Sequence, residues 1–380
     1  MDFSFTDEQS MLRDTVASYL ADNYGFDQRR NVVAKEPGWN PNVWKAFAEE
    51  LGILGAPFPE DLGGLGGGPV ENMIVMEEFG KALVVEPYLS TVVIAGGFLK
   101  HSGHPSAAEL IGKIIAGQAV FAFAYAEPQG RYNLADLTTT AKKDGGGWVL
   151  NGHKAVVAAA PWATHLIVTA RTGGGQRDAQ GISAFIVEKD AVGVTTRDYP
   201  TVDEGRASEV FLENVKVPAE ALIGPEGRGL PLIEKVVDEA LAATCAEACG
   251  VLRKLHEGTL EYTKQRKQFG VPISSFQVLQ HRMVDMFIAL EQSVSMTYMA
   301  TIKVSDDAER AKAVAGAKVQ IGKACRFVGQ SAIQLHGGMG MTDEMAIGHY
   351  FKRATMIESA FGNTDHHLAR YEFLSLGQAA

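Results

Sequence analysis

The stretch Gln334-Leu335-His336-Gly337-Gly338-Met339-Gly340-Met341-Thr342-Asp343-Glu344 carries the strongest information about the fold of this chain. An amphipathic helical pattern, from about Asp307 to Ile333, runs directly into it. The two adjacent glycines then bring bare backbone to the surface, which suits the close approach of a bulky, charged ligand. A glycine helix stop followed by a turn is the simpler interpretation of the glycines taken alone. Other stretches of the chain decide between the two.

Length and composition describe a globular protein with two or three domains. The chain has 380 residues, of which 46% are hydrophobic and 21% are charged. A formal net charge of -10 argues against a nucleic-acid partner, because binding phosphates along a nucleic acid needs clustered Lys and Arg. Local basic patches remain compatible with a phosphorylated cofactor.

The sequence contains no candidate membrane segment. Its apolar runs are shorter than the roughly 18 residues of a membrane span, and the first residues lack a signal-peptide pattern. We therefore expect a cytoplasmic protein. Cys245, Cys249 and Cys325 have no neighbouring ligands at metal-binding spacing, so we expect small buried thiols and no metal site.

Residues 1–118 are predicted to be helical. Thr6-Asp7-Glu8-Gln9 has the pattern of a capping box, and apolar residues follow at helical spacing. A Pro/Gly-rich break at residues 57–66 marks a loop between helices.

The pattern changes to short strands between residues 119 and 225. Gly, Asp and Pro clusters separate runs rich in Thr and Val, which is typical of a compact antiparallel β domain. The predicted strands are residues 120–125, 137–141, 148–150, 165–170, 183–187 and 209–217.

Long helical segments return at residues 231–265, 277–303 and 307–333. The predicted fold is therefore mainly α with a central β domain. Its parts are an N-terminal helical domain (1–118), a middle antiparallel β-barrel (119–225) and a C-terminal four-helix bundle (226–380).

Motifs in all three parts resemble the acyl-CoA dehydrogenase family, and most closely the small partner subunits of hetero-oligomeric bacterial members. The resemblance spans essentially the whole chain. It rests on Pro59-Glu60-x-x-Gly63-Gly64-x-Gly66, Glu127-Pro128, Asn151-Gly152-x-Lys154, Val215-Lys216-Val217-Pro218, Arg266-Lys267-x-Phe269-Gly270, Phe276-Gln277 and His336-Gly337-Gly338-x-Gly340.

The resemblance implies an FAD enzyme that removes two hydrogens from the α and β carbons of a CoA thioester. A carboxylate takes the α proton, the flavin takes the β hydride, and hydrogen bonds polarise the thioester carbonyl. It also implies a tetramer in which FAD lies across a subunit interface, with electron-transferring flavoprotein as the electron acceptor.

The family's nucleotide-binding residues have counterparts here. The resemblance assigns Arg266 to the FAD pyrophosphate, which suits a guanidinium fork, and Phe269 to the adenosine. The remaining residues that it assigns to the same nucleotide are Gln277, Gln334, Gly338 and Thr364.

The flavin-facing residues depart from the family pattern. Gln129-Gly130-Arg131-Tyr132 stands where the family has Gly-x-Gly-Ser, which hydrogen-bonds flavin and substrate. Val156-Val157-Ala158 replaces Trp-x-Thr beside the flavin ring. The backbone amides of Ala126 and Ala158 can still contact the ring.

Both positions that carry the catalytic base in the family lack a carboxylate. They fall on Gly362 and on Ala240-Leu241, and Leu241 replaces a family arginine. Glu239 and Glu358 are the nearest substitutes, although ordinary helix-surface or capping carboxylates are the simpler interpretation. Asp238 matches a position near the acyl-CoA chain. We expect His366 and His367 to be solvated or nucleotide-facing imidazoles rather than bases.

Three functions follow as hypotheses. The chain is the base-lacking partner in a hetero-oligomeric FAD-dependent acyl-CoA dehydrogenase, or a self-sufficient homotetramer with a relocated base. The third hypothesis is a catalytically silent structural subunit that binds no FAD, and retention of Arg266, Phe269, Gln334 and Gly338 argues against it.

Overall fold

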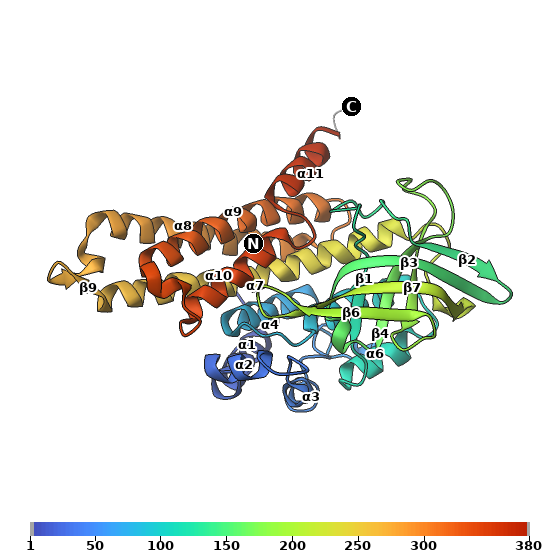
Figure 1. Ribbon diagram of the computed structural model, residues 1–380, viewed down its shortest axis with the longest axis horizontal. Coiled ribbons are helices and arrows are strands. Elements are labelled where there is room, and N and C mark those ends of the chain that lie inside the picture. Colours follow the sequence, from blue (N-terminus) through green and yellow to red (C-terminus); the bar gives the residue numbers. More distant parts are fainter. Residues whose placement is uncertain (1–3, 378–380) are drawn as a thin grey trace. The chain divides into compact units, whose positions relative to one another are not determined.

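The structure is a computed structural model that describes residues 4–377 (Figure 1). Its contacts divide the chain into two compact units. The first unit comprises the chain up to Asn31, Pro69–Val84 and the chain from Leu241 onward. The second comprises Val32–Gly68 and Val85–Ala240. Helix α7 (Leu230–Gln265) continues from the second unit into the first, and α2 (Phe26–Val33) crosses the other boundary.

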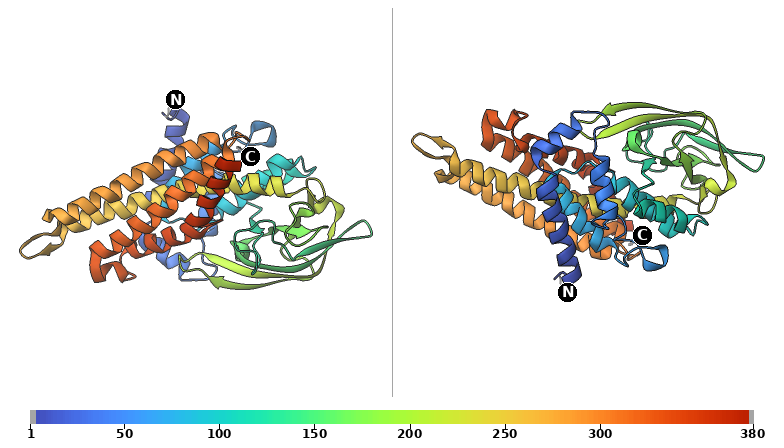
Figure 2. Two further views of the ribbon diagram at one scale, coloured as in Figure 1. Left: turned by 90° about the horizontal axis from the view of Figure 1, so that it is seen from above. Right: turned by 90° about the horizontal axis from the view of Figure 1, so that it is seen from below.

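The first unit is helical, and α9 (Arg310–His336) lies at its centre. Three other helices pack against α9, and α8 runs beside it in both Figure 1 and Figure 2. The helices around α9 and those of the N-terminal segments are α1 (Asp7–Asn23), α4 (Pro69–Ala82), α8 (Gln277–Lys303), α10 (Ala346–Ser359) and α11 (Thr364–Leu376).

Local sequence signals in this unit are confirmed. The Thr6 hydroxyl accepts the Gln9 amide proton at 3.2 Å, and the Gln9 side chain accepts the Thr6 amide proton at 3.2 Å. Helix α9 continues three residues beyond the predicted end at Ile333. It ends at His336, and the following Gly337, with a φ of +60°, caps it.

Two glycines allow α4 and α7 to cross at backbone distance. A Cβ on Gly80 would lie 2.0 Å from the Glu247 carbonyl oxygen, and one on Gly250 would lie 2.1 Å from the Glu77 carbonyl oxygen. The buried Glu247 carboxylate accepts two bonds from the Arg353 guanidinium, at 2.5 and 2.7 Å, which joins α7 to α10. This crossing explains why both positions are glycine.

The second unit is built on one mixed sheet with the order β6-β7-β3-β2-β4-β5-β8, and β1 pairs with β4. The strand pairs are antiparallel except that β1 is parallel to β4 and β2 meets β4 in parallel at one position. Strand β1 is therefore an exception to the antiparallel pairing expected for this domain. The strands are β1 (Phe121–Ala124), β2 (Thr140–Asp144), β3 (Gly147–Ala158), β4 (His165–Arg171), β5 (Ile182–Glu188), β6 (Val194–Pro200), β7 (Arg206–Pro218) and β8 (Leu222–Ile223).

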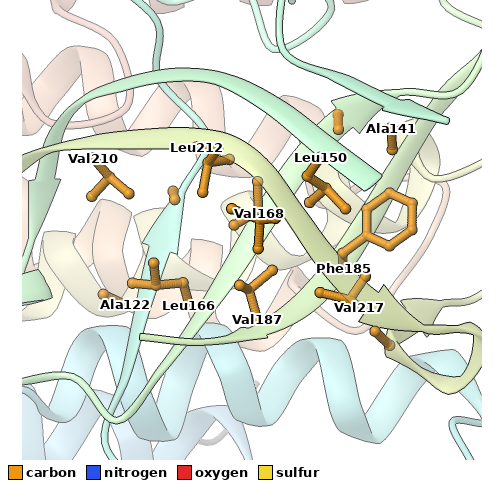
Figure 3. Packing of buried hydrophobic residues seen from close by; sticks show 14 of the residues in the cluster. Ala122, Ala141, Leu150, Leu166, Val168, Phe185, Val187, Val210, Leu212 and Val217 are labelled. Atoms are coloured by element: carbon orange, nitrogen blue, oxygen red, sulfur yellow. The ribbon is translucent and has the colours of Figure 1, made fainter. Parts of the chain in front are cut away.

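The core of the second unit lies between the strands. Side chains of Leu150, Val168, Phe185 and Val187 point toward one another from β3, β4 and β5 (Figure 3). Trp148 meets Phe185 edge to face, with ring centroids 5.3 Å apart. The remaining elements of this unit are α3 (Pro41–Glu49), η1 (Glu60–Leu62), η2 (Leu89–Ala95), α5 (Gly96–Ser102), α6 (Ala107–Ile115), η3 (Ala160–Trp162) and η4 (Ala219–Ala221).

Candidate functional site

Five of the six predicted nucleotide residues gather at one end of the first unit. Helix α7 ends at Gln265, and a short hairpin of β9 (Lys267–Gln268) and β10 (Val271–Pro272) leads through η5 (Ile273–Ser275) into α8 at Gln277. The hairpin projects from the ends of α7 and α8 (Figure 1). We call Arg266, Phe269, Gln277, Gln334 and Gly338 the hairpin-end set.

The stack of Tyr262 on His336 brings the end of α9 to this hairpin. Their ring centroids lie 4.2 Å apart, and the Tyr262 hydroxyl donates to the His336 carbonyl oxygen at 3.3 Å. His336 is held in turn by Nδ1–H, which donates to the Ala332 carbonyl oxygen at 2.8 Å. Gln334 and Gly338 each lie two residues from His336, so they belong to the end of α9 that this stack joins to the end of α7.

All five members of the hairpin-end set are exposed. Arg266 is exposed and forms no ion pair with any residue that the structure describes, and the Phe269 side chain is 93% exposed at a φ of +54°. A Cβ on Gly338, in η6 (Gly337–Met341), would have no neighbour within 4 Å, so the fold itself does not require glycine there. A free guanidinium, an open ring and bare backbone together fit a nucleotide with phosphate groups.

Thr364 lies apart from the hairpin-end set. It begins α11 and packs against α9 at Gly322, where an added Cβ would lie 2.2 Å from the Thr364 hydroxyl oxygen. Gly322 and Gln334 are 12 residues apart on one helix, which places them about 18 Å apart along its axis. Only an extended ligand could reach both Thr364 and the hairpin-end set.

A buried ion pair explains two of the sequence motifs in the second unit. Lys154 Nζ lies 2.8 Å from Glu127 Oε1, and both side chains are 0% exposed. The Glu127 carboxylate also accepts bonds from the Thr138 amide and hydroxyl and from the Thr139 amide, at 2.6–3.1 Å. Burial acts to raise the pKa of Glu127, but Lys154 and these hydrogen bonds lower it to about 2. The pair fixes the segment after β1 to strand β3.

The predicted flavin-facing residues lie on these two linked segments. The Ala155 amide donates to the Ala126 carbonyl oxygen at 2.9 Å, and Ala158 is exposed at the end of β3. The pairing of β3 with β7 shifts register between Lys154 and Val157, so Val156 sits in a bulge with a φ of +52°. Its side chain is 56% exposed.

Gly362, the position on which the sequence comparison with the family expects the base to fall, cannot easily carry a side chain. Its φ is +121°, and a Cβ there would lie 2.5 Å from His366 Cδ2 and 2.7 Å from His367 Nε2. The Gly362 carbonyl oxygen accepts a bond of 2.7 Å from the buried Lys318 Nζ, which also binds the Glu358 carbonyl oxygen at 2.8 Å. Sequence reasoning missed Lys318, because a lysine on a predicted helix is usually solvated.

The sequence predicts that His367 is a solvated or a nucleotide-facing imidazole, and the first of these alternatives is wrong. Its side chain is 1% exposed, and burial together with the charge of Lys318 lowers its pKa to about 3, so the ring is neutral. Nε2–H donates to the Phe361 carbonyl oxygen at 3.1 Å, while the buried Nδ1 has no hydrogen-bond partner among the described residues. His366 is half-buried at the start of α11. Neither arrangement resembles a base that faces an external substrate.

Both substitute carboxylates are held by neighbours within their own unit. Glu239 Oε1 lies 2.6 Å from His101 Nε2, and Glu239 Oε2 lies 3.8 Å from Lys100 Nζ. Burial acts to raise the pKa of Glu239, but these two neighbours outweigh it and lower the pKa. Glu358 accepts bonds from the Thr364 amide and hydroxyl at 3.2 and 3.1 Å, which caps α11.

The other predicted positions lie inside the fold. Ala240 and Leu241 are fully buried on α7, and Asp238 is 1% exposed. All three cysteines are buried free thiols, as predicted. Within residues 4–377 there is no group of His, Cys, Asp and Glu that could hold a metal ion, and no helix in this range is long and apolar enough to cross a membrane.

Comparison with known proteins identifies the family. Three acyl-CoA dehydrogenase domain families match in order: the N-terminal domain at residues 6–118, the middle domain at 122–215 and the C-terminal domain at 227–371. Acyl-CoA dehydrogenase FadE12 of Mycobacterium tuberculosis is 30% identical over 94% of this chain and 93% of its own. The Caffeyl-CoA reductase-Etf complex subunit CarC of Acetobacterium woodii is 31% identical over 92% of this chain and 93% of its own.

Solved structures agree. The ChsE4-ChsE5 complex from Mycobacterium tuberculosis contains a chain that is 26% identical, with a TM-score of 0.90 over 99% of both chains. A chain of the FAD complex of PigA is 25% identical, with a TM-score of 0.91 over 100% of both chains. The family and these neighbours imply FAD as the cofactor, and the free guanidinium, open ring and bare backbone of the hairpin-end set fit its nucleotide. The chain belongs to the acyl-CoA dehydrogenase family.

Proposed function

We propose that this chain is a subunit of an FAD-dependent acyl-CoA dehydrogenase that acts on a CoA thioester, and that it is the base-lacking partner in a hetero-oligomer. The observation that carries the proposal is the combination of an intact hairpin-end set with a base position closed to side chains. Gly362 is fixed by Lys318 and crowded by two imidazoles. The chain therefore keeps its means of holding a cofactor and lacks a means of taking the α proton.

The residues divide the work as follows. Arg266 binds the pyrophosphate, Phe269 packs beside the adenosine, and Gln277, Gln334 and Gly338 line the same nucleotide. FAD, when bound, supplies the acceptor for the β hydride. The backbone amides of Ala126 and Ala158 meet the flavin ring, and Asp238 lies near the acyl chain. A carboxylate of a second, acyl-CoA dehydrogenase-like chain takes the proton.

Surface character supports assembly through the C-terminal helices. Apolar side chains lie exposed along α8, which one isolated bundle does not require. They are Val278, Val284, Phe287, Ile288, Met299 and Ile302. The ChsE4-ChsE5 structure is a complex of two chains, which supports a mixed tetramer here, and CarC is a subunit of an Etf complex, which supports electron-transferring flavoprotein as the acceptor.

The alternatives differ in where the base lies. A self-sufficient homotetramer would need Glu239 or Glu358 to leave its present partners, His101 and Lys100 or the α11 cap. A silent structural subunit leaves without a role the exposed Phe269 and the exposed Arg266, which forms no ion pair among the described residues.

Cofactor content and activity separate these functions. The chain is purified alone and with its co-expressed partner, and FAD absorbance and acyl-CoA dehydrogenation are measured for both. The proposal expects FAD retention and activity only with the partner. Activity of the chain alone would establish the self-sufficient enzyme, and absence of FAD from both preparations would establish the silent subunit.

A further inference from the structure

The segment from Ala126 to Thr139 is a fixed platform in the second unit. Glu127, near its start, binds Lys154 and accepts bonds from the amides of Thr138 and Thr139 at its end. Between them, the Ala135 carbonyl oxygen accepts a bond of 2.6 Å from the Arg171 guanidinium. Asp136, buried beside it, accepts bonds from the Gln176 and Arg177 side chains at 2.6 and 2.7 Å.

The middle of the platform is a tight turn with Arg131 at its tip. The Gly130 amide donates to the Glu127 carbonyl oxygen at 3.0 Å, and the Asn133 amide donates to the Gly130 carbonyl oxygen at 2.9 Å. These bonds leave Arg131 in the left-handed region, with a φ of +47°. Glycine adopts this conformation without the steric cost that an arginine side chain brings. Strained residues of this kind gather at ligand-binding sites.

Arg131 is also the one charged side chain of this segment that stays free. It is exposed and forms no hydrogen bond or ion pair with the residues that the structure describes. Glu127 is neutralised by Lys154, and Asp136 by Arg177. Arg131 therefore gives the platform an uncompensated positive charge on a chain whose net charge is -10.

We propose that Arg131 binds an anionic group of the acyl-CoA thioester that docks on this platform. The inference rests on the proposed function, because the platform begins at Ala126, whose backbone amide that function places against the flavin ring. The phosphates of CoA and a carboxylate on the acyl tail are the two sources of such an anion. A guanidinium on a rigid turn suits either, since it offers a planar fork without prior reorganisation.

Titration calorimetry on the FAD-loaded assembly tests the inference with CoA, butyryl-CoA and glutaryl-CoA. Arg131→Gln, which removes the charge and keeps a side chain at this φ, should weaken binding by about tenfold or more. Arg131→Lys should retain part of the binding affinity that Arg131→Gln loses. Loss for all three ligands assigns the contact to a CoA phosphate, whereas loss for glutaryl-CoA alone assigns it to the acyl carboxylate. Unchanged affinity for all three ligands overturns the proposal.

Two controls separate a local effect from a general one. Lys142→Gln removes an exposed charge elsewhere in the same unit, and Asn214→Gly relaxes another left-handed residue. Neither should change the affinities. Arg131→Gly should leave the unfolding midpoint unchanged or higher while weakening binding as Arg131→Gln does, which a merely structural role would not produce. Normal FAD content with unchanged CoA affinity refutes this inference alone, whereas an assembly without FAD or CoA binding refutes the proposed function.

Discussion

Removing the Lys154 ammonium should destabilise the second unit strongly, because it leaves the Glu127 carboxylate buried without a cation. Both side chains are 0% exposed, and Lys154 also donates to the Tyr125 carbonyl oxygen and the Thr169 hydroxyl. A pKa of about 2 for Glu127, against an ordinary value of 4.5, corresponds to about 3 kcal/mol. Breaking a buried pair typically costs about 3–5 kcal/mol, so we expect a loss in that range for Lys154→Met.

Tryptophan fluorescence is a selective assay for this loss. All four tryptophans, at positions 39, 44, 148 and 162, lie in the second unit. Urea unfolding followed by their emission should show the midpoint of Lys154→Met lowered by roughly 1–2 M at pH 7. Lys216→Met breaks an exposed ion pair with Asp144 and should cost less than about 1 kcal/mol.

The pH dependence gives the sign of the effect. In the native protein the pKa of Glu127 is lowered. The ionised carboxylate therefore adds to the free energy of unfolding above pH 4.5, its ordinary pKa, and this stabilisation is lost as the pH falls toward about 2. In Lys154→Met, burial without a cation raises the Glu127 pKa, so the variant gains relative stability as this carboxylate takes up a proton. The difference in free energy of unfolding between the native protein and Lys154→Met should therefore become smaller from pH 7 to pH 4. A difference in free energy of unfolding below about 1 kcal/mol at pH 7 would refute the reasoning. So would a double variant, Lys154→Met/Glu127→Gln, that is no more stable than Lys154→Met alone.

Four further outcomes are expected. Arg266→Ala should raise the FAD dissociation constant by about tenfold or more, because it removes a charge-assisted phosphate contact; unchanged FAD content after dialysis would contradict this assignment. Glu239→Gln and Glu358→Gln should each leave the rate of dehydrogenation by the native assembly nearly unchanged, whereas removing a true base would lower that rate about 10²–10⁴-fold. Such a loss of rate with FAD still bound would identify that glutamate as the base. Gly362→Glu should lower the unfolding midpoint without giving the isolated chain activity, because a side chain at this φ destabilises the backbone by roughly 1–3 kcal/mol. A gain of activity would show that His366 and His367 move aside to admit the new carboxylate. Light scattering should show a tetramer or a dimer of dimers at micromolar concentration, and a monomer would contradict assembly through α8.

The sequence predicted those features that depend on neighbouring residues. The Thr6–Gln9 capping box, the long helices and most strands follow from local hydrogen bonds and from the periodicity of apolar side chains. Strand β6 was missed because its half-exposed residues form no apolar run. The parallel pairing of β1 with β4 joins residues 121–124 to 165–168, and no local pattern specifies such a partner.

The family resemblance assigned the hairpin-end set to a nucleotide, and that role stays a prediction. The resemblance did not reveal that Thr364 packs at Gly322, which lies about 18 Å along α9 from Gln334, since helix packing decides which residues share a site. The absence of a carboxylate at position 362 was evident from the sequence. That His366, His367 and Lys318 close this position became evident only in three dimensions.

Tertiary structure alone decided the state of the charged groups. The sequence determined that Glu127, Lys154, Glu239 and Arg131 are present and where they stand along the chain. Folding pairs Glu127 with Lys154 across 27 positions and Glu239 with His101 across 138, and it leaves Arg131 exposed on a left-handed turn. The physical reason is that burial and the charges brought close by distant segments set the ionisation and availability of a side chain, and neither is encoded by its sequence neighbours.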